Sequence, residues 1–185
     1  MGSEAISIDK YLDCDVRKKF DFLYENFSIL KPIINNYKEA IISDVADMKL
    51  YNRKTEMGEL GVRIQVSGIS NPTQSAAFRN QSIAKAIDEG YLDDEFFEHT
   101  DDPDELIRRV TVYHSVNHDF EAFKSKLDEL KPKDQKVLKP YLLGQKTMDD
   151  LVEEMEIEYH SAVMRVYRIR KRLSNLVEPK LQGGM

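Results

Sequence analysis

The sequence has little of several features that mark other classes of protein. Its 185 residues include no tryptophan and a single cysteine, Cys14, which excludes a disulfide framework and a zinc cluster held by several thiolates. Cys14 is best read as a small, buried or half-buried residue, and the compartment as a reducing cytosol. No apolar run approaches the ~20 residues that cross a bilayer, and no basic segment followed by an apolar stretch opens the chain. We therefore expect a cytoplasmic protein that does not contact membranes.

Signatures of catalysis and of cofactor binding are also missing. The chain has no glycine-rich phosphate loop, no Ser/His/Asp order and no paired-carboxylate signature. His114 and His118 have the spacing of one zinc-binding face, but Ser115 stands where a metalloprotease has Glu, and no third ligand is evident. The acids between positions 93 and 102 lack the alternating spacing and the glycine of a calcium loop. We expect no metal, no cofactor and no enzymatic activity.

The charge of the chain is distributed unevenly. The formal net charge is −6, yet residues 159–173 contain five cations and no acid, so the remaining residues must sum to −11. An acidic body of this kind is repelled by DNA everywhere except at the basic segment. The charge pattern therefore indicates residues 159–173 as the segment that would face nucleic acid.

Apolar residues recur at helical spacing through most of the chain, which predicts an all-α fold. Within residues 10–50 we expect two helices separated by Pro32, and a further helix from Pro72 to about Glu89 that Gly90 ends. A run at 62–66 alternates in the manner of a strand or an extended linker, without an identifiable partner strand.

A long helix is expected from Pro103 to about Leu130, because Asp102 can cap it and acidic residues follow in its first turn. A helix of this length needs a packing partner, either the N-terminal helices or a second copy of the chain. Its apolar stripe consists of Leu106, Val110, Tyr113, Phe120 and Leu127. We thus divide the chain into a mostly helical N-terminal region for interaction or oligomerisation (1–102), the long helix (103–130) and a C-terminal domain (131–180).

The C-terminal domain has the pattern of a helix-turn-helix. One helix is expected from Asp134 to Leu143, ending at Gly144. A second begins after Thr147 with a near capping box, and a third runs from Tyr159 to about 176, where Glu178 and Pro179 stop it. Two short helices with a tight connection, the second one basic, are typical of this DNA-binding unit.

The third helix has a buried and an exposed side. The expected buried stripe is Ala162, Val166, Ile169 and Leu173. The first turns of the exposed side mix polar and apolar residues, which suits base edges and thymine methyls, and its later turns are basic, which suits phosphates. The predicted DNA-binding residues are His160, Ser161, Val163, Met164, Arg165, Tyr167, Arg168, Lys171 and Arg172.

Residues 157–173 resemble the recognition helix of region 4 of bacterial sigma factors. They look like the pattern Ile-Ser-x-x-Thr-Val-x-x-Arg-Leu-x-Arg-Ala-Arg-x-x-Leu in an ungapped match, and residues 130–138 are similar to the start of region 4. Three departures are Glu156, where the tight turn usually has glycine, Glu158, where the helix cap is usually serine, and Pro140, which lies inside the preceding helix and should kink it. Residues 1–60 do not resemble the promoter-melting region of a sigma factor.

Two short motifs further back are similar to phage late-gene regulators of the ArpU/RinA type. They are Lys54–Met57 and Ser70–Thr73, the latter followed by an alanine-rich helix. The resemblances imply a phage or prophage transcription regulator that reads the major groove of double-stranded DNA with helix 159–176. A homodimer and contact with RNA polymerase stay open. So do two other functions, a phage terminase small subunit and a module that docks on RNA polymerase without reading DNA.

Overall fold

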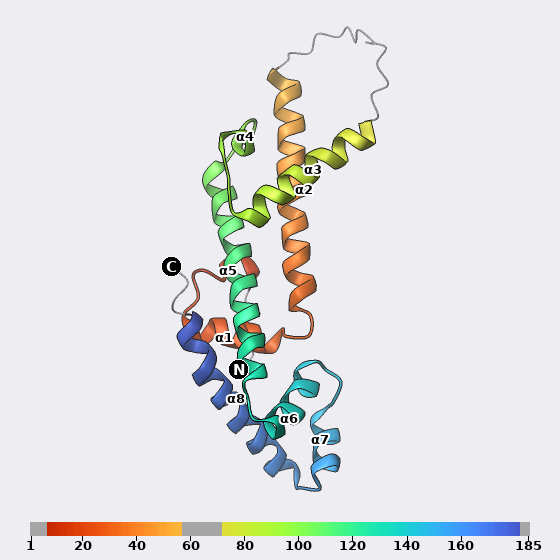
Figure 1. Ribbon diagram of the computed structural model, residues 1–185, viewed down its shortest axis with the longest axis vertical. Coiled ribbons are helices and arrows are strands. Elements are labelled where there is room, and N and C mark those ends of the chain that lie inside the picture. The colour runs from red at the N-terminus through yellow and green to blue at the C-terminus, as the bar shows by residue number, and fades with distance from the viewer. Residues whose placement is uncertain (1–6, 57–71, 182–185) are drawn as a thin grey trace. The chain divides into compact units, whose positions relative to one another are not determined.

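The computed structural model describes residues 7–56 and 72–181, which are mostly helical (Figure 1). They form eight α-helices and one 3-10 helix, with no strand among them, so the prediction of an all-α fold is confirmed. The alternating run 62–66 and the side chains of the two ArpU/RinA-like motifs lie outside the described residues. In chain order the elements are η1 (Ile8–Lys10), α1 (Val16–Glu25), α2 (Leu30–Glu56), α3 (Pro72–Glu89), α4 (Asp94–Phe97), α5 (Pro103–Asp128), α6 (Pro132–Leu142), α7 (Met148–Met155) and α8 (Tyr159–Leu181).

Two compact units make up the fold. The first takes in the residues up to 34 and those from 115 onward, and the second takes in residues 35–114. The boundaries fall inside α2 and α5. The first unit therefore joins α1 to the three C-terminal helices, although some hundred residues of chain separate them.

An aromatic cluster forms part of the core of the first unit. The ring centroid of Phe123 on α5 lies 5.8 Å from that of Phe20 on α1 and 5.5 Å from that of Phe27. Nearby, Tyr11 is fully buried and donates a hydrogen bond of 2.9 Å to Oδ2 of Asp119, which satisfies both buried polar groups. These contacts tie the N-terminal residues to the second half of α5.

The second unit has its own apolar core, formed by α2, α3, α4 and α5. Its buried members are Ile41, Ile42, Val45, Ala46, Ile83, Ile87, Phe96, Leu106 and Val110. Two ion pairs lie beside this core, one of 2.6 Å between Lys38 and Asp88 and one of 2.8 Å between Arg109 and Asp44.

Local signals in the sequence place most of the helix ends. Gly90 follows α3 with φ +66°, a left-handed conformation that favours glycine. Asp102 accepts a hydrogen bond of 3.0 Å from the backbone N–H of Glu105 and so caps α5. Pro32 does not stand between two helices: it lies in the first turn of α2, where a missing N–H costs nothing, and the break falls at residues 26–29.

The end of α8 differs from the sequence prediction. The helix was expected to stop at Glu178 and Pro179, but it continues to Leu181. Val177 and Leu181 extend the buried stripe with exposed fractions of 0% and 4%, so packing offsets the hydrogen bond that Pro179 cannot donate. In the part of the chain that the structure describes, no helix is both long and apolar enough to cross a bilayer.

Candidate nucleic-acid interface

A capping box starts α7, the first helix of the predicted helix-turn-helix. The hydroxyl of Thr147 accepts a hydrogen bond of 3.2 Å from the backbone N–H of Asp150, whose carboxylate accepts one of 2.7 Å from the N–H of Thr147. The hydrogen bonds from Thr147 lower the pKa of the Asp150 carboxyl below its usual value. The predicted cap is therefore present, with its partner three residues on.

The turn between α7 and α8 is made without glycine. Glu156 has φ 51° and ψ 42°, a left-handed conformation that costs a non-glycine residue about 1–2 kcal/mol. The backbone N–H of Ile157 donates to the carbonyl of Val152 at 3.3 Å and closes the turn. Glu156 thus adopts the left-handed conformation that glycine usually supplies at this position of the sigma-factor pattern, at a steric cost that glycine would not have.

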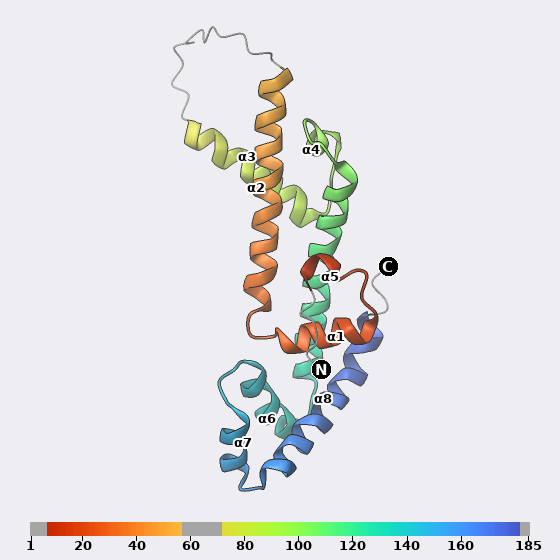
Figure 2. The ribbon, with the colours of Figure 1, turned by 180° about the vertical axis from the view of Figure 1, so that it is seen from behind.

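α8 packs along its predicted apolar stripe. Ala162, Val166, Ile169 and Leu173 are 0–6% exposed, which confirms the predicted helical phase. α6, α7 and α1 all contact α8. Figures 1 and 2 show α6 and α7 alongside the N-terminal half of α8 and α1 alongside its C-terminal half.

The opposite side of α8 carries the predicted DNA-binding residues. Val163, Met164 and Arg165 are half-buried. The remaining six are exposed, namely His160, Ser161, Tyr167, Arg168, Lys171 and Arg172. All nine thus lie on α8 outside its buried stripe.

Two of the five cations in residues 159–173 of α8 are occupied by ion pairs within the fold. Arg172 pairs with Asp134 of α6 at 2.7 Å, and Asp134 is only 5% exposed. Arg170 pairs with Asp21 of α1 at 2.6 Å, and its guanidinium lies 4.4 Å from the ring centroid of Tyr24. Arg172 therefore joins α8 to α6, and Arg170 joins it to α1.

The other three cations are free to meet a partner. Within residues 7–56 and 72–181, Arg165, Arg168 and Lys171 have no ion pair or hydrogen bond through their side chains. The charge that residues 159–173 can offer to phosphate is therefore closer to +3 than to the +5 counted from the sequence. Arg172 remains a predicted contact only if its guanidinium reaches DNA while paired with Asp134.

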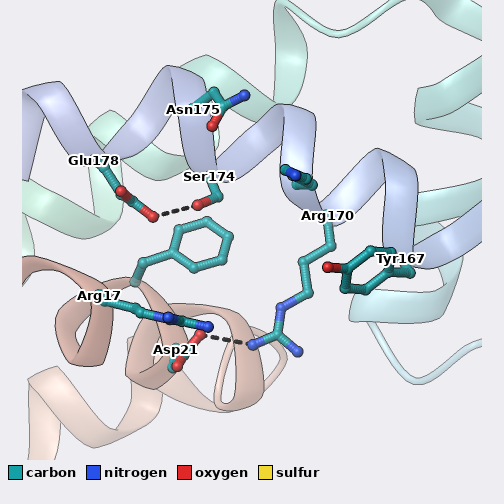
Figure 3. Close-up of a pocket in the computed structure, with 9 residues that line it drawn as sticks. Arg17, Asp21, Tyr167, Arg170, Ser174, Asn175 and Glu178 are labelled. Carbon is teal, nitrogen blue, oxygen red and sulfur yellow. Dashed lines mark hydrogen bonds and ion pairs between the residues drawn. The ribbon is translucent and has the colours of Figure 1, made fainter.

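Sequence reasoning missed a groove between α1 and α8, which has a volume of about 470 Å³. We call it the α1–α8 groove, and its principal lining residues are Arg17, Asp21, Tyr167, Arg170, Lys171 and Ser174. Figure 3 shows Arg17 and Asp21 on α1 opposite Arg170, Tyr167 and Ser174 on α8. No periodicity in the sequence signals such a groove, because Asp21 and Arg170 are 149 residues apart.

α7 itself is strongly acidic on its outer side. Six carboxylates on this helix and in the turn after it are exposed, namely Asp149, Asp150, Glu153, Glu154, Glu156 and Glu158. Only Asp150, in the capping box, and Glu154, which pairs with Lys146 at 2.5 Å, have a polar side-chain partner among the described residues. Any approach of DNA to α8 must therefore keep phosphates away from this side of α7.

The two spaced histidines make separate local contacts. Nε2 of His114 lies 2.6 Å from the carbonyl oxygen of Ile87 in α3, and Nδ1 of His118 lies 3.2 Å from Oδ1 of Asp119. Among the described residues, no group of three or more His, Cys, Asp or Glu side chains is arranged to hold a metal ion.

Comparisons of the chain with protein-family models, with curated proteins and with solved structures found no match in any of the three. The resemblances to sigma region 4 and to ArpU/RinA-type regulators therefore stay predictions from the sequence.

Proposed function

We propose that this chain is a sequence-specific DNA-binding transcription regulator that reads the major groove with α8. The observation that carries the proposal is the exposed side of α8. Its first two turns present His160, Ser161, Val163 and Met164, and its next turns present cations without ion-pair partners. An α-helix fits the major groove, where base edges carry a distinct pattern for each base pair.

The division of this surface favours duplex DNA as the partner. Polar and apolar side chains near the start of a recognition helix reach base edges, and cations further along reach the phosphates that flank them. The three unpaired cations predict a slope of log affinity against log salt of about −3, because each phosphate contact contributes about −0.9.

The resemblance to ArpU/RinA-type regulators extends the proposal to a phage or prophage regulator of late genes. That extension rests on residues 54–57 and 70–73 of the sequence. Sigma region 4 meets both DNA and RNA polymerase, so the polymerase is a proposed partner beside DNA.

A second candidate is a module that docks on RNA polymerase without reading DNA. The six exposed carboxylates of α7 and its turn favour it, because they repel phosphates and suit a basic protein surface. In the usual docking geometry the first helix of the motif crosses the DNA backbone, which is where this acidity would oppose binding.

One experiment separates these functions. The full-length protein is used to select duplexes from a random library, and its affinity for the selected site is compared with that for a scrambled duplex of the same composition. A preference of about 10³-fold or more is expected of a regulator. Equal affinity for both duplexes, together with binding to RNA polymerase, would favour the docking module. A ring-shaped oligomer in light scattering would instead favour a terminase small subunit.

A further inference from the structure

α1 brings additional positive charge beside the exposed side of α8. Arg17 lies on α1, faces the α1–α8 groove and has no ion pair in the described part of the chain (Figure 3). On the facing helix, Lys171 is also exposed and unpaired. The groove thus holds two cations from different helices that the fold itself does not use.

The acids of the groove are already engaged. Asp21 pairs with Arg170 at 2.6 Å, and the carboxylate of Glu178 accepts a hydrogen bond from the hydroxyl of Ser174 (Figure 3). Three cations and two carboxylates line the groove, so one positive charge is in surplus. A phosphodiester carries one negative charge and offers acceptor oxygens to guanidinium and ammonium donors.

The groove lies in line with the predicted base-reading residues. Spacings of three and four residues place His160, Val163, Tyr167, Lys171 and Ser174 along one ridge of α8. Ser174 is eleven residues beyond Val163, about 16 Å along the helix axis. The major groove is about 12 Å wide, so when Val163 lies at base edges, the turns around Ser174 lie over the bordering sugar-phosphate backbone.

We infer that the α1–α8 groove binds a backbone phosphate of the same DNA duplex that α8 reads, with Arg17 of α1 as the residue that contacts it. This inference rests on the proposed function. It makes the N-terminal helix part of the DNA-binding surface, and it assigns the Asp21–Arg170 pair the task of holding α1 in place beside α8. Because a phosphate contact carries no sequence information, Arg17 contributes affinity and register without selecting bases.

The test compares Arg17→Gln with Lys18→Gln in the full-length protein. Lys18 is the neighbouring cation of α1, 66% exposed and outside the groove, so its replacement removes the same charge from the same helix. The probe is the selected duplex, and affinity is measured between 50 and 200 mM salt. Arg17→Gln is expected to reduce the magnitude of the salt slope by about 0.9. Its affinity for the selected duplex should therefore be lower than that of the wild type at 50 mM salt, and the ratio of the two affinities should shrink about three- to fourfold by 200 mM. Lys18→Gln should leave the salt slope nearly unchanged. Arg17→Lys keeps the positive charge in the groove and should therefore show the wild-type salt slope.

The outcomes separate the inference from the proposed function. If the wild type prefers the selected duplex and Arg168→Ala lowers the slope, but Arg17→Gln behaves like Lys18→Gln, the groove does not bind phosphate and the proposed function stands. If the wild type shows no preference among duplexes, both ideas fail together. Circular dichroism melts check that Arg17→Gln is folded, as expected for an exposed, unpaired residue.

Discussion

Arg172 of α8 donates a hydrogen bond of 2.7 Å to Oδ2 of Asp134 in the first turn of α6. The carboxylate is 5% exposed, whereas the arginine side chain is 56% exposed. The arginine therefore satisfies a buried acid while most of its own surface faces solvent. A residue that charge counting assigns to DNA also has a role in joining α8 to α6.

This pairing predicts an asymmetric effect of mutation. Arg172→Ala leaves Asp134 buried without its partner and should lower the free energy of unfolding by about 1–3 kcal/mol. In the Asp134→Asn background the same replacement should cost less, because the two residues are coupled. Urea unfolding measures both. Arg168→Ala is the control, since Arg168 is exposed and unpaired and should stay within about 0.5 kcal/mol of wild type. Equal effects of Arg172→Ala and Arg168→Ala would show that the pair contributes nothing.

The left-handed turn residue predicts a stabilising substitution. Glu156→Gly removes the steric cost of φ 51° but adds freedom to the unfolded chain, so a net gain of about 0.5–1 kcal/mol is expected. Glu153→Gly makes the same chemical change three residues earlier, inside α7, and should destabilise by about 1 kcal/mol. Thermal melts of the two variants should therefore move in opposite directions. A loss of stability in both would mean that Glu156 is not strained.

The capping box predicts a dependence on pH. The pKa of Asp150 is lowered in the folded protein, so its stabilising contribution is full above the unfolded value near 3.8 and is lost as pH falls through the lowered pKa. The stability difference between wild type and Asp150→Asn should be present at pH 7 and shrink toward pH 3. Asp149→Asn is the control, because it removes a charge from the same turn but Asp149 makes no cap hydrogen bond. Its stability difference from wild type should not show this loss between pH 7 and pH 3. A pH-independent difference for Asp150→Asn would contradict the role of its ionised carboxylate.

The sequence predicted those parts of the fold that depend on neighbouring residues. The caps at Asp102 and Thr147, the end of α3 at Gly90 and the buried stripe of α8 each follow from side chains within a turn or two of one another. The predicted end of α8 was wrong, because the local rule that proline stops a helix was outweighed at Pro179 by the burial of Leu181. That burial depends on residues far away in the sequence.

The partners of individual side chains could not be predicted in the same way. Asp134 looked like an ordinary acid at the start of a helix, and nothing in its neighbourhood signals that Arg172 covers it. Likewise, the periodicity of α1 defines an apolar face but does not tell which helix that face meets. The α1–α8 groove and the reduced number of free cations both follow from such long-range pairings, so they required the structure.

The buried stripe of α8 predicts a contrast between neighbouring residues. Val166→Asp places an unpaired charge where the side chain is 6% exposed and should lower the free energy of unfolding by roughly 3–5 kcal/mol. Tyr167→Asp introduces the same charge one residue later, at a side chain that is 56% exposed, and should cost far less. Urea unfolding of the two variants tests the helical phase of α8. If Val166→Asp keeps wild-type stability, the burial of this stripe is wrong.

The sharpest test of the mechanism is a comparison of Met164→Ala with Arg168→Ala. Met164 lies in the second turn of α8, where a recognition helix meets base edges, so its removal should narrow the gap between the selected and scrambled duplexes by about 1–3 kcal/mol. Arg168 lies one turn further on and should reach a phosphate. Its removal should weaken binding to both duplexes alike and reduce the salt slope by about one unit. The two variants should therefore fail in different ways in the same binding assay, one in selectivity and the other in salt dependence.

Lys10→Ala provides the matched control for Arg168→Ala, because it removes an exposed cation from η1 that is not among the residues lining the α1–α8 groove. A general electrostatic effect would weaken binding equally in both variants, whereas a phosphate contact affects the slope only when Arg168 is lost. If Met164→Ala and Arg168→Ala both bind the selected duplex with unchanged affinity and slope, α8 is not the DNA-reading surface. The acidic side of α7 would then be the surface to test next, by charge reversal at Glu153 and binding to RNA polymerase, since a docking module needs those carboxylates and not the cations of α8.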